Sequence, residues 1–279
     1  MDAAGWVQLA LIIAGFVLIT KPLGVYLVQV LDPDVGGEPW LARALGPVER
    51  VSYRVLGVDP KKEQTWRQYT VSMILFTGVT ALVTYVLLRI QHLLPLNPQK
   101  LGSIRPDLAF NTAASFTTNT NWQSYGGEST MSYLSQMLAL VLHNFTSPVI
   151  GIGIAAVLVR GIARSSGSTL GNFWRDVIRQ TLYLFLPAAI IYAVFLMFQG
   201  IPQNFLPYPA AKTVEGATQT IAQGPIASQI AIKMLGTNGG GYMNVNAAHP
   251  FENPTPLSNF VQIVLFIAIC SGLTYYLGR

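Results

Sequence analysis

The chain has 279 residues and a net charge of +5, yet only 10% of its residues are charged and 51% are hydrophobic. A soluble domain carries about 25% charged residues, so this composition excludes an ordinary soluble enzyme and indicates a protein surrounded largely by lipid. Five runs contain no charge and are about as long as the roughly 20 residues that a membrane-spanning helix needs. These runs are Ala3–Thr20, Tyr69–Leu88, Met131–Val159, Gln180–Gln199 and Leu257–Gly278.

The first run opens the chain. Asp2 stands where a cleaved signal peptide would carry Lys or Arg, and the apolar sequence resumes after Lys21-Pro22 and continues to Leu31. We therefore expect residues 1–31 to form a retained first transmembrane helix. Cys270, the single cysteine, lies inside an apolar run and is expected to have a structural role.

Basic residues mark two of the four connections between these runs. By the positive-inside rule, the connections richest in Lys and Arg are cytoplasmic, which places the amino terminus outside and the carboxyl terminus inside. The bases lie at membrane edges and form no stripe, which favours anionic lipid headgroups over nucleic acid as their partners. The first basic connection is either a docking surface for a partner or a solvated loop. The basic clusters are Arg43, Arg50, Arg54, Lys61, Lys62 and Arg67, then Arg160, Arg164, Arg175 and Arg179; the outer connections hold Lys100, Arg105, Lys212 and Lys233.

Each outer connection contains an apolar helix candidate too short to cross a membrane. These candidates are Pro106–Phe116 and Pro225–Leu235, both opened by proline, which suits the first helical position. Apolar segments of this length in a membrane protein are typical of buried or re-entrant helices. Irregular chain rich in Asn, Thr and Gly follows each candidate, at residues 118–121 and 237–241, and leads into the next span. The sequence therefore predicts two re-entrant pore loops.

The two pore loops form an internal repeat. Thr118-Asn119 matches Thr237-Asn238 at a separation of 119 residues, and Gln136 matches Gln262 at a separation of 126. Repeats of this kind are expected where a site lies on a pseudo-symmetry axis. We predict an all-α polytopic membrane protein with a first helix at 1–31, a cytoplasmic loop at 32–68, a span–pore-loop–span repeat at 69–160, a second cytoplasmic loop at 161–179 and a second repeat at 180–279.

Loops of this composition suit a monovalent cation. Backbone carbonyls can replace the hydration shell of an ion, and Gly239, Gly240 and Gly241 are expected to supply the unusual backbone angles that aim carbonyls inward. A divalent ion would call for clustered carboxylates. The alternative is that both loops are ordinary exterior turns, and their matched positions favour the pore loops.

Several stretches resemble one family closely: 118–125 (TNTNWQSY), 203–208 (QNFLPY), 235–241 (LGTNGGG) and 249–254 (HPFENP). They are similar to the A subunit of the bacterial Kdp potassium-transporting ATPase, and the resemblance covers essentially the whole chain. It implies the fold of the superfamily of potassium transporters, with four span–pore-loop–span repeats around one pore. It also implies high-affinity potassium uptake across the bacterial inner membrane, together with a P-type ATPase catalytic subunit and small accessory membrane subunits.

The resemblance also implies site residues, with potassium as the transported ion. The filter residues are Thr118, Asn119, Thr120 and Asn121 in the first loop and Thr237, Asn238, Gly239 and Gly240 in the second. Gln123, Gly241 and Asn246 are implied to lie next to the filter. Two repeats supply half of the implied ring, so we expect a missing carboxyl-terminal half, a second chain or a paired copy to complete it.

The catalytic chemistry is expected on another chain. The sequence has neither a G-x-x-x-x-G-K-[ST] loop nor the Asp-Lys-Thr-Gly segment of a P-type phosphorylation site. A passive potassium channel or symporter subunit is the alternative function. Four polar residues have open roles: His143 and Asn144 pack inside the bundle or line the pathway, and Glu128 and Glu252 enrich cations at the mouth or hydrogen-bond the loops.

Overall fold

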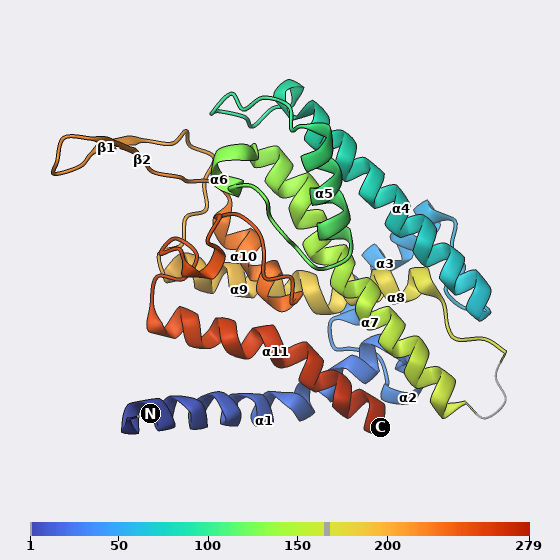
Figure 1. Cartoon of the computed structure of the whole chain (residues 1–279). Coiled ribbons are helices and arrows are strands. Elements are labelled where there is room, and N and C mark those ends of the chain that lie inside the picture. The colour runs from blue at the N-terminus through green and yellow to red at the C-terminus, as the bar shows by residue number, and fades with distance from the viewer. Residues whose placement is uncertain (1, 165–167) are drawn as a thin grey trace.

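The computed structural model describes residues 2–164 and 168–279, and its architecture is helical throughout apart from one small hairpin (Figure 1). Five helices are long and apolar enough to cross a membrane, which confirms the predicted polytopic all-α fold. The spans are Ala3–Leu31, Trp66–Leu93, Ser135–Ala163, Phe173–Phe198 and Pro256–Gly278.

The spans are assembled from the following elements. The helices are α1 (Ala3–Leu31), α2 (Pro33–Gly36), α3 (Ala42–Leu56), α4 (Trp66–Ile90), α5 (Pro106–Thr117), α6 (Gly127–Thr130), α7 (Val141–Ala163), α8 (Phe173–Arg179), α9 (Leu186–Phe198), α10 (Ile226–Leu235) and α11 (Pro256–Gly278). Short 3₁₀ turns lie at Gln91–Leu93 and Asn246–Ala248, and π-helical turns lie at Ser135–Leu140 and Gln180–Phe185. Strands β1 (Ala210–Lys212) and β2 (Thr218–Thr220) pair antiparallel and project from the helices (Figure 1).

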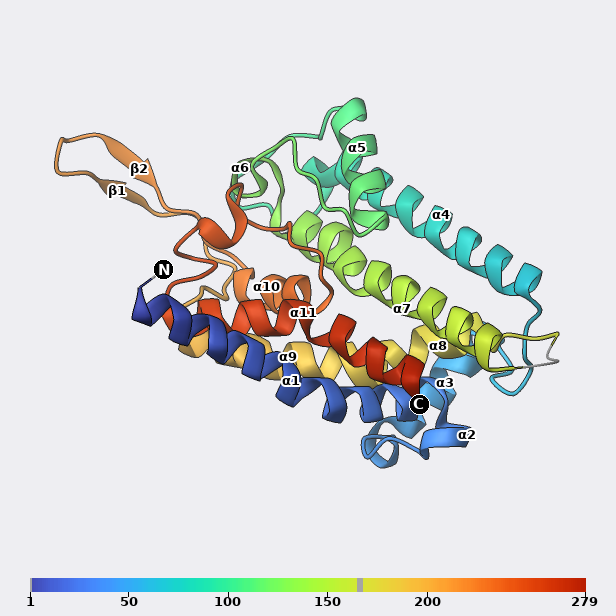
Figure 2. The same ribbon diagram turned by 60° about the horizontal axis from the view of Figure 1, so that its bottom comes forward.

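The first and last spans pack against each other along their length. Helices α1 and α11 run side by side in both views (Figures 1 and 2). Glycines permit the close approach: a Cβ at Gly24 would lie 2.5 Å from the side chain of Tyr275, and one at Gly272 would lie 3.0 Å from Leu27. Small residues at such contacts let transmembrane helices approach closely. This contact joins α1 to the second repeat, because α11 is the last span of that repeat and also contacts α10.

The first basic connection is folded onto the transmembrane helices. Helix α3 lies within residues 32–68 and packs against α8 and the π-helical turn that follows it. Its Glu49 accepts a hydrogen bond from Arg179 (Nη1 to Oε1, 3.2 Å) and a second from the Tyr183 hydroxyl. The segment is therefore an ordered part of the fold, and its partner, if any, stays a prediction.

Three of the bases counted toward the orientation are buried ion-pair members. Arg160 and Arg179 are only 6% and 4% exposed and Lys233 is fully buried in α10. Acidic partners on other elements neutralise all three, so they carry less weight for the orientation than unpaired bases would. The other bases still give the two inner connections the larger number, so the predicted orientation is unchanged.

Candidate ion-binding site

Two helices among the spans are too short to cross a membrane. Helix α5 has 12 residues and α10 has 10. Pro106 occupies the first turn of α5 and Pro225 immediately precedes α10, so both begin where the sequence predicted, to within one residue. The carboxyl-terminal ends of both helices line one cavity, so the negative ends of two helix dipoles converge there. This arrangement favours a cation.

Both helices end with the same backbone hydrogen bonds. The Ser115 carbonyl accepts from the amides of Thr120 (3.1 Å) and Asn121 (3.2 Å). The Lys233 carbonyl accepts from those of Asn238 (3.0 Å) and Gly239 (3.5 Å). The repeat therefore aligns at 118 residues.

The predicted pairing of Thr118-Asn119 with Thr237-Asn238 is wrong by one residue. The predicted pairing was based on identical side chains, whereas the structural alignment is based on the backbone hydrogen bonds at the end of each short helix. In the structural alignment, Asn119 corresponds to Thr237 and Asn121 corresponds to Gly239.

The backbone angles repeat at the same separation. Asn119 and Asn121 have φ of 64° and 56°, and Thr237 and Gly239 have φ of 58° and 79°. A left-handed backbone costs a non-glycine residue roughly 1–2 kcal/mol, and a β-branched residue such as Thr237 is rarely found there. Strained backbone of this kind gathers at functional sites. Two loops that carry it at equivalent positions therefore indicate a built site.

The glycine prediction holds only in part. Gly239 has a positive φ, as expected, whereas Gly240 and Gly241 do not. These two glycines instead make room for neighbours, because a Cβ at Gly240 would lie 2.4 Å from the Asn121 carbonyl oxygen and one at Gly241 would lie 3.1 Å from Cδ of Lys233. They are needed for close approach, not for their backbone angles.

Side-chain amides of the first loop hydrogen-bond to the backbone of the second. Asn121 Nδ2 donates to the Gly240 carbonyl oxygen (2.9 Å), and Asn119 Nδ2 donates to that of Gly236 (3.3 Å). Gln123 makes a double contact with Gly241: its Nε2 donates to the carbonyl (2.7 Å) and its Oε1 accepts from the amide (3.1 Å). The two loops thus form one hydrogen-bonded unit.

The structure brings the predicted neighbours of the filter together. The Gly241 amide also donates to Asn246 Oδ1 at 2.9 Å, so Gln123, Gly241 and Asn246 meet at one point. In the first loop the hydroxyls of Thr118 and Thr120 lie 2.8 Å apart. Both threonine residues are exposed.

The third span supplies contacts that the sequence did not identify. Ser147 Oγ donates to Asn119 Oδ1 (2.7 Å) and accepts from Asn238 Nδ2 (3.1 Å). Asn144 Oδ1 accepts from Asn121 Nδ2 (3.0 Å), while the His143 ring lies 3.3 Å from the Thr117 hydroxyl. These α7 side chains therefore brace the end of α5 and the two loops. Their polar side chains inside an apolar span indicated a special role, but the sequence did not show which residues they contact.

The two acidic residues after the loops are hydrogen-bond acceptors. Glu128 Oε2 accepts from the Asn244 amide (2.8 Å), and Glu252 Oε1 accepts from the Met243 amide (2.8 Å). Glu252 is fully buried. Of the two roles considered for them, hydrogen bonding to the loop is confirmed.

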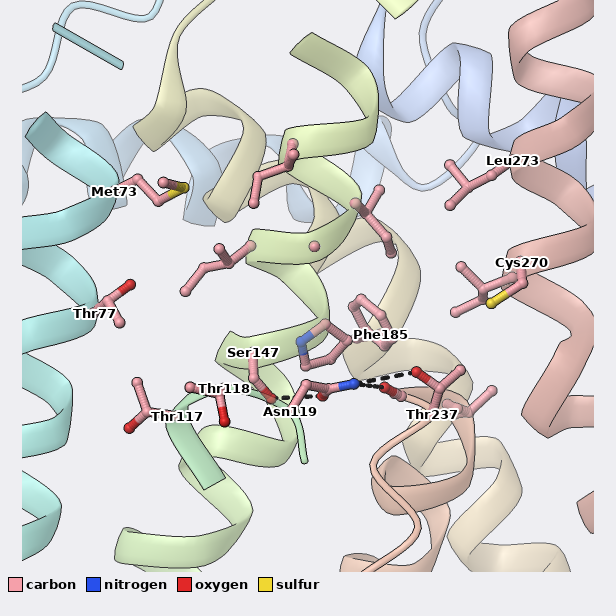
Figure 3. Close-up of a pocket in the computed structure, with 18 of the residues that line it drawn as sticks. Met73, Thr77, Thr117, Thr118, Asn119, Ser147, Phe185, Thr237, Cys270 and Leu273 are labelled. Atoms are coloured by element: carbon pink, nitrogen blue, oxygen red, sulfur yellow. Dashed lines mark hydrogen bonds between the residues drawn. The ribbon is translucent and has the colours of Figure 1, made fainter. Parts of the chain in front are cut away.

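Beside the loops lies a cavity of about 680 Å³ between α4, α7 and α11. Thr118, Asn119, Ser147 and Thr237 contribute polar atoms to it, as do Thr77 and Thr117. Figure 3 shows Asn119 hydrogen-bonded between Ser147 and Thr237. No Asp, Glu, Lys or Arg among the described residues lines it. Within residues 2–164 and 168–279, no three His, Cys, Asp or Glu side chains gather as metal ligands. Neutral oxygens are thus the available ligands.

Five candidate spans with two short helices that converge on a neutral polar site define a polytopic membrane protein of the potassium-transporter type. Residues 10–279 match the family described as potassium-transporting ATPase A subunit (KdpA), and the chain belongs to this family.

Curated relatives agree along the entire chain. The potassium-transporting ATPase potassium-binding subunits of Methylobacterium radiotolerans and Rhodopseudomonas palustris are 55% and 56% identical to it, over 279 and 281 aligned residues. The protein of the same name from Granulibacter bethesdensis is 52% identical. All of this chain is covered, against 48% or 49% of each relative, so the chain spans about half the length of the curated relatives it matches.

Proposed function

We propose that residues 118–121 and 237–240 form two segments of a potassium filter that receives the ion from the outer side of the bacterial inner membrane. The observation that carries this proposal is the matched pair of loops, with left-handed residues at equivalent positions and hydrogen bonds between them. Gln123, Gly241 and Asn246 brace the filter at its edge.

Neutral ligands suit potassium because the ion must leave the site again. Carbonyl and hydroxyl oxygens replace its hydration shell, and the dipoles of α5 and α10 add partial negative charge without a carboxylate. Carboxylates would instead favour a divalent ion. The names of the relatives, which are potassium-binding subunits, support the same assignment.

The rest of the ring is proposed to come from two further pore loops. The relatives are about twice as long, and the exposed Thr118 and Thr120 leave one side of the filter open. A carboxyl-terminal half or a second chain would cover that side.

Ion uptake is proposed to be driven by ATP hydrolysis on a separate P-type catalytic subunit, with small accessory membrane subunits and lipid around the complex. The relatives' names favour this function over that of a passive channel or symporter subunit. Uptake by the complete complex is therefore expected to stop when ATP is removed, whereas a channel would continue to conduct.

The Gln123→Leu variant tests the filter. It removes two hydrogen bonds between the loops, each worth about 0.5–1.5 kcal/mol, so the potassium concentration for half-saturation is expected to rise roughly 5- to 150-fold. The measurement is potassium binding by the full-length protein in its complex. Gln203→Leu is the matched control, because Gln203 makes the same double contact with Ser228 (3.0 Å for both bonds) outside the filter. Equal affinities in the two variants would contradict the proposed filter.

Thiol labelling tests the proposed orientation. On a Cys270→Ser background, cysteines at positions 61 and 164 are expected to be protected from an impermeant reagent added outside intact cells, and cysteines at 129 and 212 to react. Lys61 and Lys212 are both exposed, so access does not depend on unfolding. Labelling at 61 without labelling at 212 would reverse the topology.

A further inference from the structure

A buried ion pair lies directly behind the second filter loop. The Lys233 ammonium donates to the Glu252 carboxylate, and both side chains are fully buried. Lys233 is the only charged residue of α10. Charged groups at membrane depth are costly unless they are paired, and they are commonly associated with function. The proposed function above makes no use of this pair.

The backbone of Lys233 also holds the start of the second filter loop. Its carbonyl accepts the amides of Asn238 (3.0 Å) and Gly239 (3.5 Å), so its backbone and its side chain both act on the loop. Its side chain also packs against Gly241, because a Cβ added to Gly241 would lie 3.1 Å from Lys233 Cδ. Movement of the lysine would therefore move Gly239 and Gly241 together.

Glu252 contacts two further segments. Its Oε1 accepts from the Met243 amide (2.8 Å), which fixes the chain that leaves the loop. Its carbonyl accepts from Gln262 Nε2 of α11 (2.7 Å). One carboxylate thus ties the pore helix to the chain after the filter, and its own backbone is tied to the last span.

The first repeat achieves the same connection without a charge. Ser115 occupies the position equivalent to Lys233, and its hydroxyl donates to the Trp122 carbonyl (3.1 Å). The two repeats therefore differ in one respect that matters to a cation: only the second places a positive charge behind its filter loop. Glu252 supplies the opposite charge that cancels it.

We propose that Lys233 and Glu252 are positioning residues that set the geometry of the second filter loop and keep its surroundings electrically neutral, and thereby determine affinity and discrimination between potassium and sodium. The inference rests on the proposed filter. An unpaired lysine repels the bound ion while it keeps its proton, whereas an unpaired glutamate repels no cation, whether it is ionised or protonated. The two single variants are therefore expected to differ.

Potassium binding and competition by sodium are measured in the full-length protein within its complex. E252Q keeps an oxygen for the Met243 amide but leaves the lysine unpaired. Its half-saturating potassium concentration is expected to rise at least tenfold, with reduced discrimination against sodium. K233M is expected to change half-saturation less, and K233M/E252Q to recover most of the loss seen in E252Q. A merely structural pair would lower the thermal midpoint of both single variants without this difference in affinity.

E252D, which retains the charge on a shorter side chain, is measured instead if E252Q does not assemble. It is expected to discriminate less well between potassium and sodium. Wild-type half-saturation and discrimination in the folded variants would overturn the inference. If Gln123→Leu nevertheless weakens potassium binding, the proposed filter stands and only the role of the pair is lost. If Gln123→Leu is also unchanged, the filter itself is refuted.

Discussion

Replacing Gly240 with alanine is expected to reduce potassium affinity about 100-fold or more, which corresponds to roughly 3 kcal/mol. The added Cβ would lie 2.4 Å from the Asn121 carbonyl oxygen and 2.8 Å from the Asn121 Cβ. Because the nearest atom belongs to the backbone, no side-chain rotation relieves the clash and the two loops must separate. Separation also weakens the hydrogen bond from Asn121 Nδ2 to the Gly240 carbonyl.

Binding isotherms of the full-length protein in its complex measure this effect. Gly151→Ala is the matched control: Gly151 lines the same cavity but has no atom within 4 Å of an added Cβ. Its affinity is expected to be unchanged. Gly239→Ala isolates backbone strain, since its φ is 79° and the nearest atom is 4.0 Å away. Its potassium affinity is expected to lie between those of Gly240→Ala and Gly151→Ala. Wild-type affinity in folded Gly240→Ala protein would show that the loops do not bind as one unit.

The spans and both pore helices were predictable because hydropathy and proline position are local signals. Charge-free runs set the transmembrane helices, and Pro106 and Pro225 mark where α5 and α10 begin. The family motifs then pointed to the loops that contact each other. None of this required knowledge of which residues meet in space.

The register of the repeat was not predictable from residue identity. Both loops contain Thr-Asn, but hydrogen bonds at the helix ends align Asn119 with Thr237. A one-residue error of this kind in the alignment arises because the two loops share a backbone conformation while their side chains differ. The partners of Lys233 and Arg160 were hidden for a different reason. Glu252 and Asp176 follow their bases by 19 and 16 residues, and Asp32 is 128 residues from Arg160, so none of these pairs has the three- or four-residue spacing of a helix face. A base in the sequence looks the same whether its side chain is exposed or paired.

Arg160→Met is expected to destabilise the protein by about 3–5 kcal/mol, the usual cost of breaking a buried ion pair. Arg160 holds Asp176 with two hydrogen bonds (2.7 and 3.0 Å) and Asp32 with a third (2.9 Å). It also donates to the Leu31 carbonyl (2.9 Å), so it ties the end of α1 to α7 and α8. Without it, Asp176, which is 2% exposed, retains only the Tyr69 hydroxyl (3.0 Å) among the described side chains.

Thermal unfolding of the purified full-length protein in detergent measures this loss. Arg105→Met is the matched control, since Arg105 and Asp107 form an ion pair whose side chains are 80% and 64% exposed, and exposed pairs contribute about 0–1 kcal/mol. Arg160→Met/Asp176→Asn is expected to be less destabilised than Arg160→Met, because no unpaired carboxylate then remains at position 176. If Arg160→Met unfolds at the same temperature as Arg105→Met, the buried cluster does not hold the first span in place. In that case the contacts between α1 and α11 must anchor it on their own.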